Sequence, residues 1–131
     1  MYTRATFNKT FCSFGFKSYL TSVNVNKYRI ALCKLRVSSH WLNIERGRWN
    51  GTPRNERICR FCNKVEDEYH FLFECTIYST IRETYLSRYY RVRPNMFKTV
   101  ELFSSDKVKL LRNLAVYVYK AFELRQCLQN M

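Results

Sequence analysis

Four residues with metal-binding side chains, Cys59, Cys62, His70 and Cys75, follow one another in the spacing C-x2-C-x7-H-x4-C. This motif limits the possible folds more than any other feature, because its four ligands must converge if they hold one ion. The first two cysteines can bind from a tight turn, and the other two residues from a helical turn and its exit. Three thiolates and one imidazole complete a tetrahedral Zn²⁺ site without a position for water, which is typical of structural zinc. The alternative is four unrelated buried residues, since free cysteine often packs as a small apolar side chain.

The composition favours a single helical domain. A length of 131 residues matches the usual size of one domain, about 100–150 residues. Hydrophobic residues make up 47% of the chain and aromatic residues 17%, which is enough for a packed core. Three glycines and two prolines favour long regular elements over tight turns. We therefore expect one mostly α-helical domain over residues 1–131, with short helices in residues 1–22 and one zinc knuckle or short hairpin inserted.

The remaining cysteines and the hydropathy pattern indicate an intracellular protein. If three of the six cysteines bind the metal, Cys12, Cys33 and Cys127 remain. An odd number of thiols fits a reducing compartment better than a disulfide framework. No apolar run approaches the length of a membrane span, and the first residues lack the apolar core of a signal peptide. The sequence therefore predicts a nuclear or cytoplasmic protein that does not enter a membrane.

Positive charge is concentrated outside the metal motif. The chain has 23 Lys and Arg against 10 Asp and Glu, which gives a formal net charge of +13. Residues 1–58 carry +9 and residues 76–131 carry +6, whereas residues 59–75 carry −2. A basic balance of this size attracts polyanions, most commonly RNA or DNA. The charge alone also fits a protein whose cations keep it soluble, or one that meets an acidic protein partner.

Residues 24–46 are predicted to form the central helix, which Asn24 or Asn26 caps and Gly47 ends. Apolar residues fall on two opposite sides, so the helix is expected to pack between other elements and to expose cations along its margins. These cations could follow a phosphate backbone or simply be solvated. The apolar residues are Tyr28, Ala31, Leu32 and Leu35 on one side and Ile30, Cys33 and Val37 on the other.

Residues 47–58 are expected to form an arginine-rich loop around Trp49, with Gly47 and Gly51 as turn residues. Arginine beside an aromatic side chain suits phosphate pairing together with stacking on an unpaired base. The loop leads into Cys59 and is the first candidate for nucleic-acid contact, although Trp49 could instead fold onto the core. The candidate residues are Arg46, Arg48, Trp49, Arg54, Arg57 and Arg60, with Lys27 and Lys34 as secondary contacts.

The metal module, residues 59–75, is predicted to combine the knuckle with the start of a helix. Asp67 can cap this helix and place His70 in its first turn, while Glu66 and Glu68 suit the positive helix N-terminus. The acidic run is therefore interpreted as capping chemistry and not as a pair of catalytic carboxylates.

No residue pattern in the chain indicates catalysis. The four ligands complete a closed site, so His40 is expected to be a structural histidine rather than a fifth ligand or a catalytic base. Neither an activated nucleophile nor an acid–base pair stands out, and no small-molecule substrate is expected. The sequence therefore predicts a protein that is not an enzyme.

Residues 76–131 are predicted to form the C-terminal helices. One helix is expected to run to Pro94, with Arg82 among the residues that supply its positive charge. A short helix follows over residues 95–103, and Asp106 caps a last helix that closes the core. The apolar face of that last helix comprises Leu110, Leu111, Leu114, Val118, Ala121 and Phe122.

The runs LRVSSHWLNIERGRWNGTPRNERICRFC and VEDEYHFLFEC, followed by Tyr78 and Arg82, resemble the C-terminal region of non-LTR retrotransposon polyproteins. In those proteins a zinc-binding CCHC segment lies downstream of the reverse transcriptase. The similarity covers about residues 15–90. The seven residues between Cys62 and His70 separate this spacing from the retroviral zinc knuckle, which has fewer.

Position by position, the resemblance implies that Cys59, Cys62, His70 and Cys75 bind one structural Zn²⁺. It also implies that the segment helps a reverse transcriptase to engage its template RNA or target DNA. The reverse transcriptase portion of a larger polyprotein is then an expected partner. The polymerase active site of the family lies elsewhere, and no Tyr-x-Asp-Asp motif is present in this chain.

We therefore expect a zinc-dependent domain that binds the RNA or DNA backbone with little sequence specificity. The rival interpretation is a protein-interaction module, also held together by zinc, whose tyrosine and phenylalanine surfaces dock a partner. The rival predicts a contiguous exposed apolar patch, with the arginines scattered over the surface.

Overall fold

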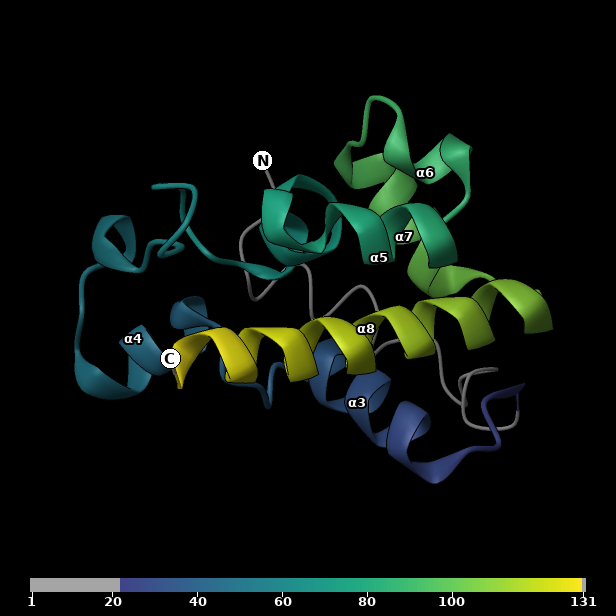
Figure 1. The fold of residues 1–131 in the computed structure, drawn as a ribbon, viewed down its shortest axis with the longest axis horizontal. Coiled ribbons are helices and arrows are strands. Elements are labelled where there is room, and N and C mark those ends of the chain that lie inside the picture. The colour runs from purple at the N-terminus through teal and green to yellow at the C-terminus, as the bar shows by residue number, and fades with distance from the viewer. Residues whose placement is uncertain (1–21, 131) are drawn as a thin grey trace.

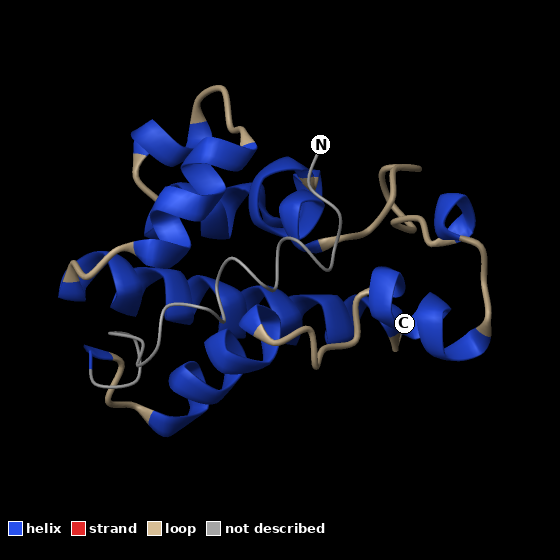
Figure 2. Ribbon diagram, turned by 180° about the vertical axis from the view of Figure 1, so that it is seen from behind, coloured by secondary structure: helices blue, strands red, loops and turns tan. Residues whose placement is uncertain are grey.

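The computed structural model describes residues 22–130, and in this part of the chain it is built from helices and loops (Figures 1 and 2). One isolated antiparallel bridge, between Ile58 and Val65, is added to the helices. The expectation of a mostly α-helical domain with a short hairpin inserted is confirmed. The helices are α3 (Asn26–Arg36), α4 (Asn43–Asn50), η1 (Arg54–Glu56), η2 (His70–Glu74), η3 (Thr76–Tyr78), α5 (Ser79–Tyr85), α6 (Arg88–Arg91), α7 (Met96–Ser104) and α8 (Val108–Gln129). The short helices expected in residues 1–22 lie outside the described residues, apart from residue 22.

Helix α8 is the centre of the fold. It runs along the length of the molecule in Figure 1, with α3 on one side and α5 on the other, and it packs against both. Its predicted apolar face is confirmed: Leu111, Leu114 and Val118 are fully buried in the core. Among the described helices, none has the length and apolar character needed to cross a membrane.

The predicted central helix over residues 24–46 is wrong, because the structure divides it into α3 and α4. Helix α3 ends at Arg36, and Ser38 follows with φ of 65° in the left-handed region. Arg36 turns into the core, where its guanidinium donates a 2.6 Å hydrogen bond to the carbonyl of Phe103. Helix α4 then begins at Asn43, whose backbone N–H donates to Glu66 Oε1 at 2.7 Å. A carboxylate at a helix N-terminus satisfies free N–H groups, so a residue from the metal module determines where α4 starts.

On the second apolar side of the predicted helix, Cys33 packs against the core but Ile30 and Val37 face solvent, which contradicts the expected packing on two sides. Ile30 and Val37 are each 51% exposed, whereas Leu32 and Leu35 on the first side are fully buried against the core. The start of α3 also differs from the prediction. Val25 occupies the N-cap position, and no side chain caps the helix there.

The predicted loop over residues 47–58 is partly helical. Helix α4 continues to Asn50 and ends at Gly51, which adopts φ of 74°, so Gly51 and not Gly47 is the left-handed stop. Gly47 lies inside α4, and the Arg57 side chain passes directly over its Cα. A larger residue does not fit there, because a methyl group would overlap Arg57 Cγ and lie 2.6 Å from Cδ. The Arg57 guanidinium donates to the carbonyls of Thr52 at 2.8 Å and Ile44 at 3.2 Å. Arg57 thereby fastens the segment after α4 to the helix.

We expect Gly47→Ala to lower the free energy of unfolding by about 1–3 kcal/mol, the usual cost of overpacking. The added methyl group displaces the Arg57 stem, even though alanine favours a helix by about 0.5–1 kcal/mol relative to glycine. Urea unfolding measures the effect. In an Arg57→Ala background the same Gly47→Ala change is expected to stabilise the protein. A destabilisation of equal size in both backgrounds would contradict the contact.

The helix expected to run from Cys75 to Pro94 is also interrupted, because Leu86 turns into the core. Leu86 is buried and has an extended backbone that ends α5, and Ser87, also extended, starts α6. The short helix expected over residues 95–103 is confirmed as α7. Asp106 does not cap α8, since Lys107 occupies the N-cap position without a side-chain bond.

Candidate functional site

A short hairpin holds the first two candidate ligands. The bridge between Ile58 and Val65 closes its base, and the N–H of Cys59 donates to the carbonyl of Lys64 at 2.7 Å. Asn63 turns the chain with φ of 57°, and its N–H donates to the carbonyl of Cys59 at 3.2 Å. The hairpin therefore places Cys59 and Cys62 on one tight turn, as the spacing predicts.

A single widened helical turn holds the other two ligands. Asp67 caps it as expected, because the N–H of His70 donates to Asp67 Oδ1 at 2.8 Å. Residues His70–Glu74 form a π-helical turn, in which the N–H of Cys75 donates to the carbonyl of His70 at 2.9 Å. Single π-turns are rare and are frequent at functional sites. Here the five-residue step brings Cys75 back beside His70.

The four side chains converge on one point. One ligand atom from each of Cys59, Cys62, His70 and Cys75 lies within 4.8 Å of all the others. The Sγ atom of Cys75 is 3.8 Å from that of Cys59 and 3.8 Å from that of Cys62. Two Zn–S bonds of about 2.3 Å at the tetrahedral angle separate their sulfurs by about 3.8 Å. The sulfur spacing therefore matches a tetrahedral zinc site.

The imidazole of His70 gives a second test of whether a metal fits. His70 is buried, and neither ring nitrogen has a hydrogen-bond partner among the described residues. Glu74 Oε1 is 3.5 Å from Nδ1, a distance and direction that do not make a hydrogen bond. A buried polar atom without a partner costs about 1–3 kcal/mol. A metal ion among the sulfurs would satisfy one of these nitrogens.

The surroundings of the thiols differ. Burial raises the pKa of Cys59 and raises that of Cys75 to about 12. Burial acts in the same direction on Cys62, but hydrogen bonds from the backbone and hydroxyl of Thr76 outweigh it and lower the pKa of Cys62. Backbone amides also donate toward the sulfurs of Cys59 and Cys75. Such amides stabilise thiolate charge, which metal binding requires.

No protein-family model, curated protein or solved structure matches this chain. The Cys₃His cluster therefore stands on its own geometry, which fits one metal ion.

Two acidic residues beside the site were predicted to act on a helix N-terminus, and the structure gives them a larger role. Glu66 is buried and forms a bidentate pair with Arg125 of α8, at 3.0 Å to Nε and 2.8 Å to Nη2. Glu68 is buried and lies 3.1 Å from Nε2 of His40. Because His40 Nδ1 accepts the N–H of Leu42 at 3.3 Å, Nε2 is the nitrogen that donates to Glu68. His40 is thus a structural histidine, as expected.

Arg82, which the sequence analysis counted only among the residues that supply positive charge to its helix, is buried. Its guanidinium donates to the carbonyl of Leu72 at 2.8 Å and to that of Cys75 at 2.9 Å. These carbonyls end the turn that carries the third and fourth ligands. Arg82 therefore holds the exit of the metal module against α5, and the hydroxyl of Tyr117 supports it by donating to the carbonyl of Phe71 at 2.6 Å.

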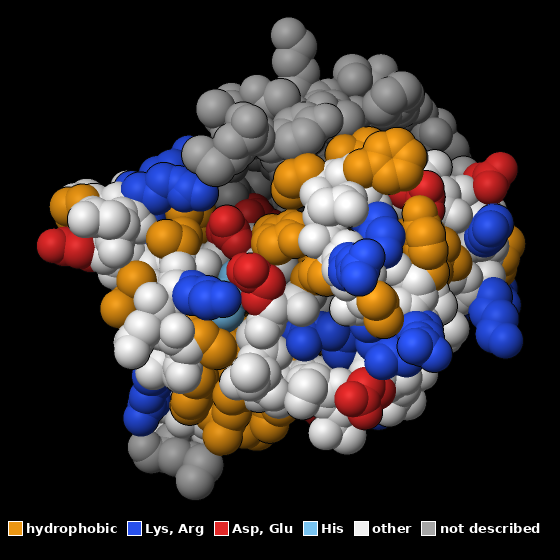
Figure 3. All heavy atoms as spheres, turned by 90° about the horizontal axis from the view of Figure 1, so that it is seen from above, with side chains coloured by type: hydrophobic (Ala, Val, Ile, Leu, Met, Phe, Trp, Pro, Cys, Tyr) orange, Lys and Arg blue, Asp and Glu red, His pale blue; other side chains and the backbone are white. Residues whose placement is uncertain are grey.

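The structure does not bring the eight candidate nucleic-acid residues together. On the face seen in Figure 3, Lys and Arg side chains lie in separate groups, with acidic and hydrophobic side chains between them. Arg48 pairs with Glu45 at 2.8 Å, and Arg54 lies 3.7 Å from Asp67. Arg60 lies over the ring of Phe61, and Arg57 bonds within the fold as described above.

Three of the eight candidates do share one site. Lys27, Lys34 and Arg46 line a single groove together with Trp41, a residue that the sequence analysis does not single out. Trp41 is 66% exposed, and its ring meets that of Trp49 edge to face at 5.8 Å. The position of Trp41 between Lys34 and Arg46 in the sequence is the signal that could have identified this surface.

Proposed function

We propose that the protein is a zinc-stabilised domain that binds RNA or DNA and has no enzymatic activity. The excess of exposed cations is the observation that carries the nucleic-acid part. Among the described residues, three acidic and three arginine side chains are buried, so their burial removes no net positive charge from the surface and lowers the share of acidic residues outside the core. A surface of this charge attracts a phosphate backbone. The buried residues are Glu45, Glu66, Glu68, Arg36, Arg82 and Arg125.

In this proposal the metal has a structural role. Cys59, Cys62, His70 and Cys75 would hold one Zn²⁺ with all four positions filled by protein, which leaves none for a substrate. Zinc supplies binding free energy to the folded state when it is bound. Hydrogen bonds of Glu66 and Glu68 connect the metal module to the first residue of α4, to His40 and to Arg125.

We further propose the role that the resemblance implies, in the nucleus or the cytoplasm. The domain would help the reverse transcriptase portion of a non-LTR retrotransposon polyprotein to engage RNA or DNA. This proposal rests on the residues that carry the resemblance.

Zinc content and salt-dependent binding test the proposal together. We expect one zinc ion per chain by elemental analysis. We also expect binding to oligonucleotides at about 50 mM salt, weakening steeply toward about 200 mM as counterions are released. Fluorescence anisotropy measures the binding. Folded protein without zinc would refute the metal site, and absence of binding near 50 mM salt would refute the nucleic-acid function.

One observation favours the rival protein-interaction module. Ile30 on α3 and Val37, which directly follows the last residue of α3, are both half-exposed apolar side chains. If these side chains dock a protein, Val37→Ser, which lies outside the residues that line the groove between α3 and α8, should abolish capture of that partner and leave oligonucleotide affinity unchanged.

A further inference from the structure

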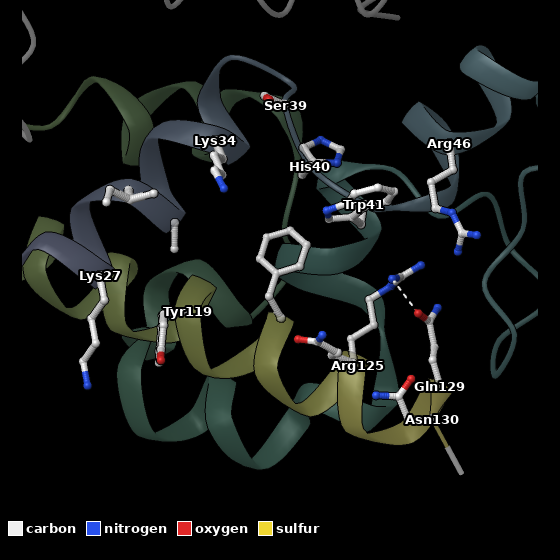
Figure 4. Close-up of a pocket in the computed structure, with 14 residues that line it drawn as sticks. Lys27, Lys34, Ser39, His40, Trp41, Arg46, Tyr119, Arg125, Gln129 and Asn130 are labelled. Carbon is white, nitrogen blue, oxygen red and sulfur yellow. Dashed lines mark hydrogen bonds between the residues drawn. The ribbon is translucent and has the colours of Figure 1, made fainter.

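A groove opens between α3 and the C-terminal half of α8 and is closed at one end by the segment that leads into α4 (Figure 4). Its volume of about 520 Å³ falls within the range of about 300–1,000 Å³ that is typical of sites for small ligands. We call it the basic groove and define it by Lys27, Lys34, Trp41, Arg46, Phe122 and Arg125.

The charge of the basic groove is uniformly positive. All ten acidic residues of the chain lie in the described part, and none of them lines the groove. Arg125 is neutralised by Glu66. None of the ion pairs among the described residues involves Lys27, Lys34 or Arg46. Three cations without a paired carboxylate therefore face one cavity.

The groove also offers aromatic surface. In the view of Figure 4, Trp41 lies between Lys34 and Arg46, across the groove from Arg125 on α8. Trp41 is the more exposed of the two tryptophans. An exposed indole leaves apolar surface in contact with water, and every nucleobase presents a flat face that can stack on it and cover that surface. Trp41 therefore suits an unpaired base, with phosphates on the flanking cations.

On the strength of the proposed function, we infer that the basic groove binds single-stranded RNA or DNA. An unpaired base stacks on Trp41, and the adjoining phosphates pair with Lys34 and Arg46. The arginines at positions 54 and 60 lie outside this site. A duplex keeps its bases stacked inside, so it cannot present one to a groove of this kind.

Two double variants with equal charge changes test where the strand binds. Lys34→Gln/Arg46→Gln removes two groove cations, and Arg54→Gln/Arg60→Gln removes two exposed cations outside it. The probe is single-stranded oligothymidylate of about 12 nucleotides, within the site sizes of about 4–16 nucleotides of single-strand binders. We expect the groove variant to lower the salt slope by about 1.4 and the affinity roughly tenfold for each lost phosphate contact at about 50 mM salt. The control variant should change the affinity less than about threefold.

The two tryptophans provide an independent readout, since the chain has no others. Trp49→Phe leaves Trp41 as the sole indole, and its fluorescence should be quenched on binding of the strand. Trp41→Phe leaves Trp49, which touches the ring at position 41 only by an edge-to-face contact, so its fluorescence should change less than that of Trp41 does. Trp41→Ala should weaken binding about 5- to 150-fold, the range for one stacked base.

Several outcomes would overturn the inference while the proposed function stands. These are equal losses in the two double variants, quenching of Trp49 alone, or duplex DNA bound as tightly as the single strand. A polyglutamate peptide that quenches Trp41 as strongly as the oligonucleotide would also overturn it, and would assign the groove to an acidic protein segment. If the unmodified protein binds no oligonucleotide, both the inference and the proposed function fail.

Discussion

Replacement of Cys62 by serine is expected to abolish zinc binding and to unfold most of the domain. Structural zinc contributes an apparent binding free energy of about 10–16 kcal/mol in zinc-finger peptides, and a typical domain is stable by only about 5–15 kcal/mol. Cys62 is the most suitable ligand for this test because it is half-buried, whereas Cys59 and Cys75 are fully buried. Its replacement therefore removes a ligand with little loss of core packing. Elemental analysis and circular dichroism measure the two effects.

Cys127→Ser is the matched control, because Cys127 is exposed on α8 and lies outside the metal cluster. This variant should keep one zinc ion and the melting temperature of the unmodified protein. A chelator added to the unmodified protein should reproduce the unfolding of Cys62→Ser. A Cys62→Ser protein that keeps the zinc content and the melting temperature of the unmodified protein would show that Cys62 is not a zinc ligand and would contradict the four-ligand site.

Arg125→Met is expected to lower the free energy of unfolding by about 3–5 kcal/mol, since it leaves Glu66 buried without its cation. The Glu66 carboxylate would keep only the N–H of Asn43 among the hydrogen bonds described above. Urea unfolding of the zinc-loaded protein measures the loss.

A second substitution, at Glu66, separates the cost of the unpaired carboxylate from the cost of losing the Arg125 side chain. Glu66→Gln/Arg125→Met should be more stable than Arg125→Met alone, because the amide removes the buried charge and can still accept the Asn43 N–H. Arg54→Met is the surface control, and we expect it to cost at most about 1 kcal/mol because Arg54 is exposed and its contact with Asp67 is long, at 3.7 Å. A loss for Arg125→Met as small as that of the control would mean that the buried pair contributes little.

The parts of the site that sequence could predict are those built by neighbours in the chain. The spacing of the cysteines requires a tight turn, and Asp67 lies three residues before His70, the distance of an N-cap interaction. The apolar face of α8 was also predictable, because it follows the helical period.

The parts that sequence could not predict depend on distant partners. Residues 24–46 carry an uninterrupted helical pattern, yet α4 starts where a carboxylate 23 residues later meets the N–H of Asn43. Arg125 and Glu66 are 59 residues apart. In the sequence Arg82 is one of several cations in its segment, and only the fold shows that it donates to the carbonyls of Leu72 and Cys75. Local propensity carries no information about such contacts. The prediction that α3 packs on two sides is wrong for the same reason, because burial depends on which distant elements contact the helix.

The acidic pair Glu66 and Glu68, next to the metal ligands, connects the two proposed sites through its side-chain contacts. Glu66 and Glu68 flank the residue that caps the His70 turn, and their partners Arg125 and His40 both line the basic groove. Whatever factor zinc adds to the affinity of the groove, a bound strand must add the same factor to the affinity for zinc. Nucleic acid would then protect the metal from competing chelators, and a zinc-depleted chain would release its strand.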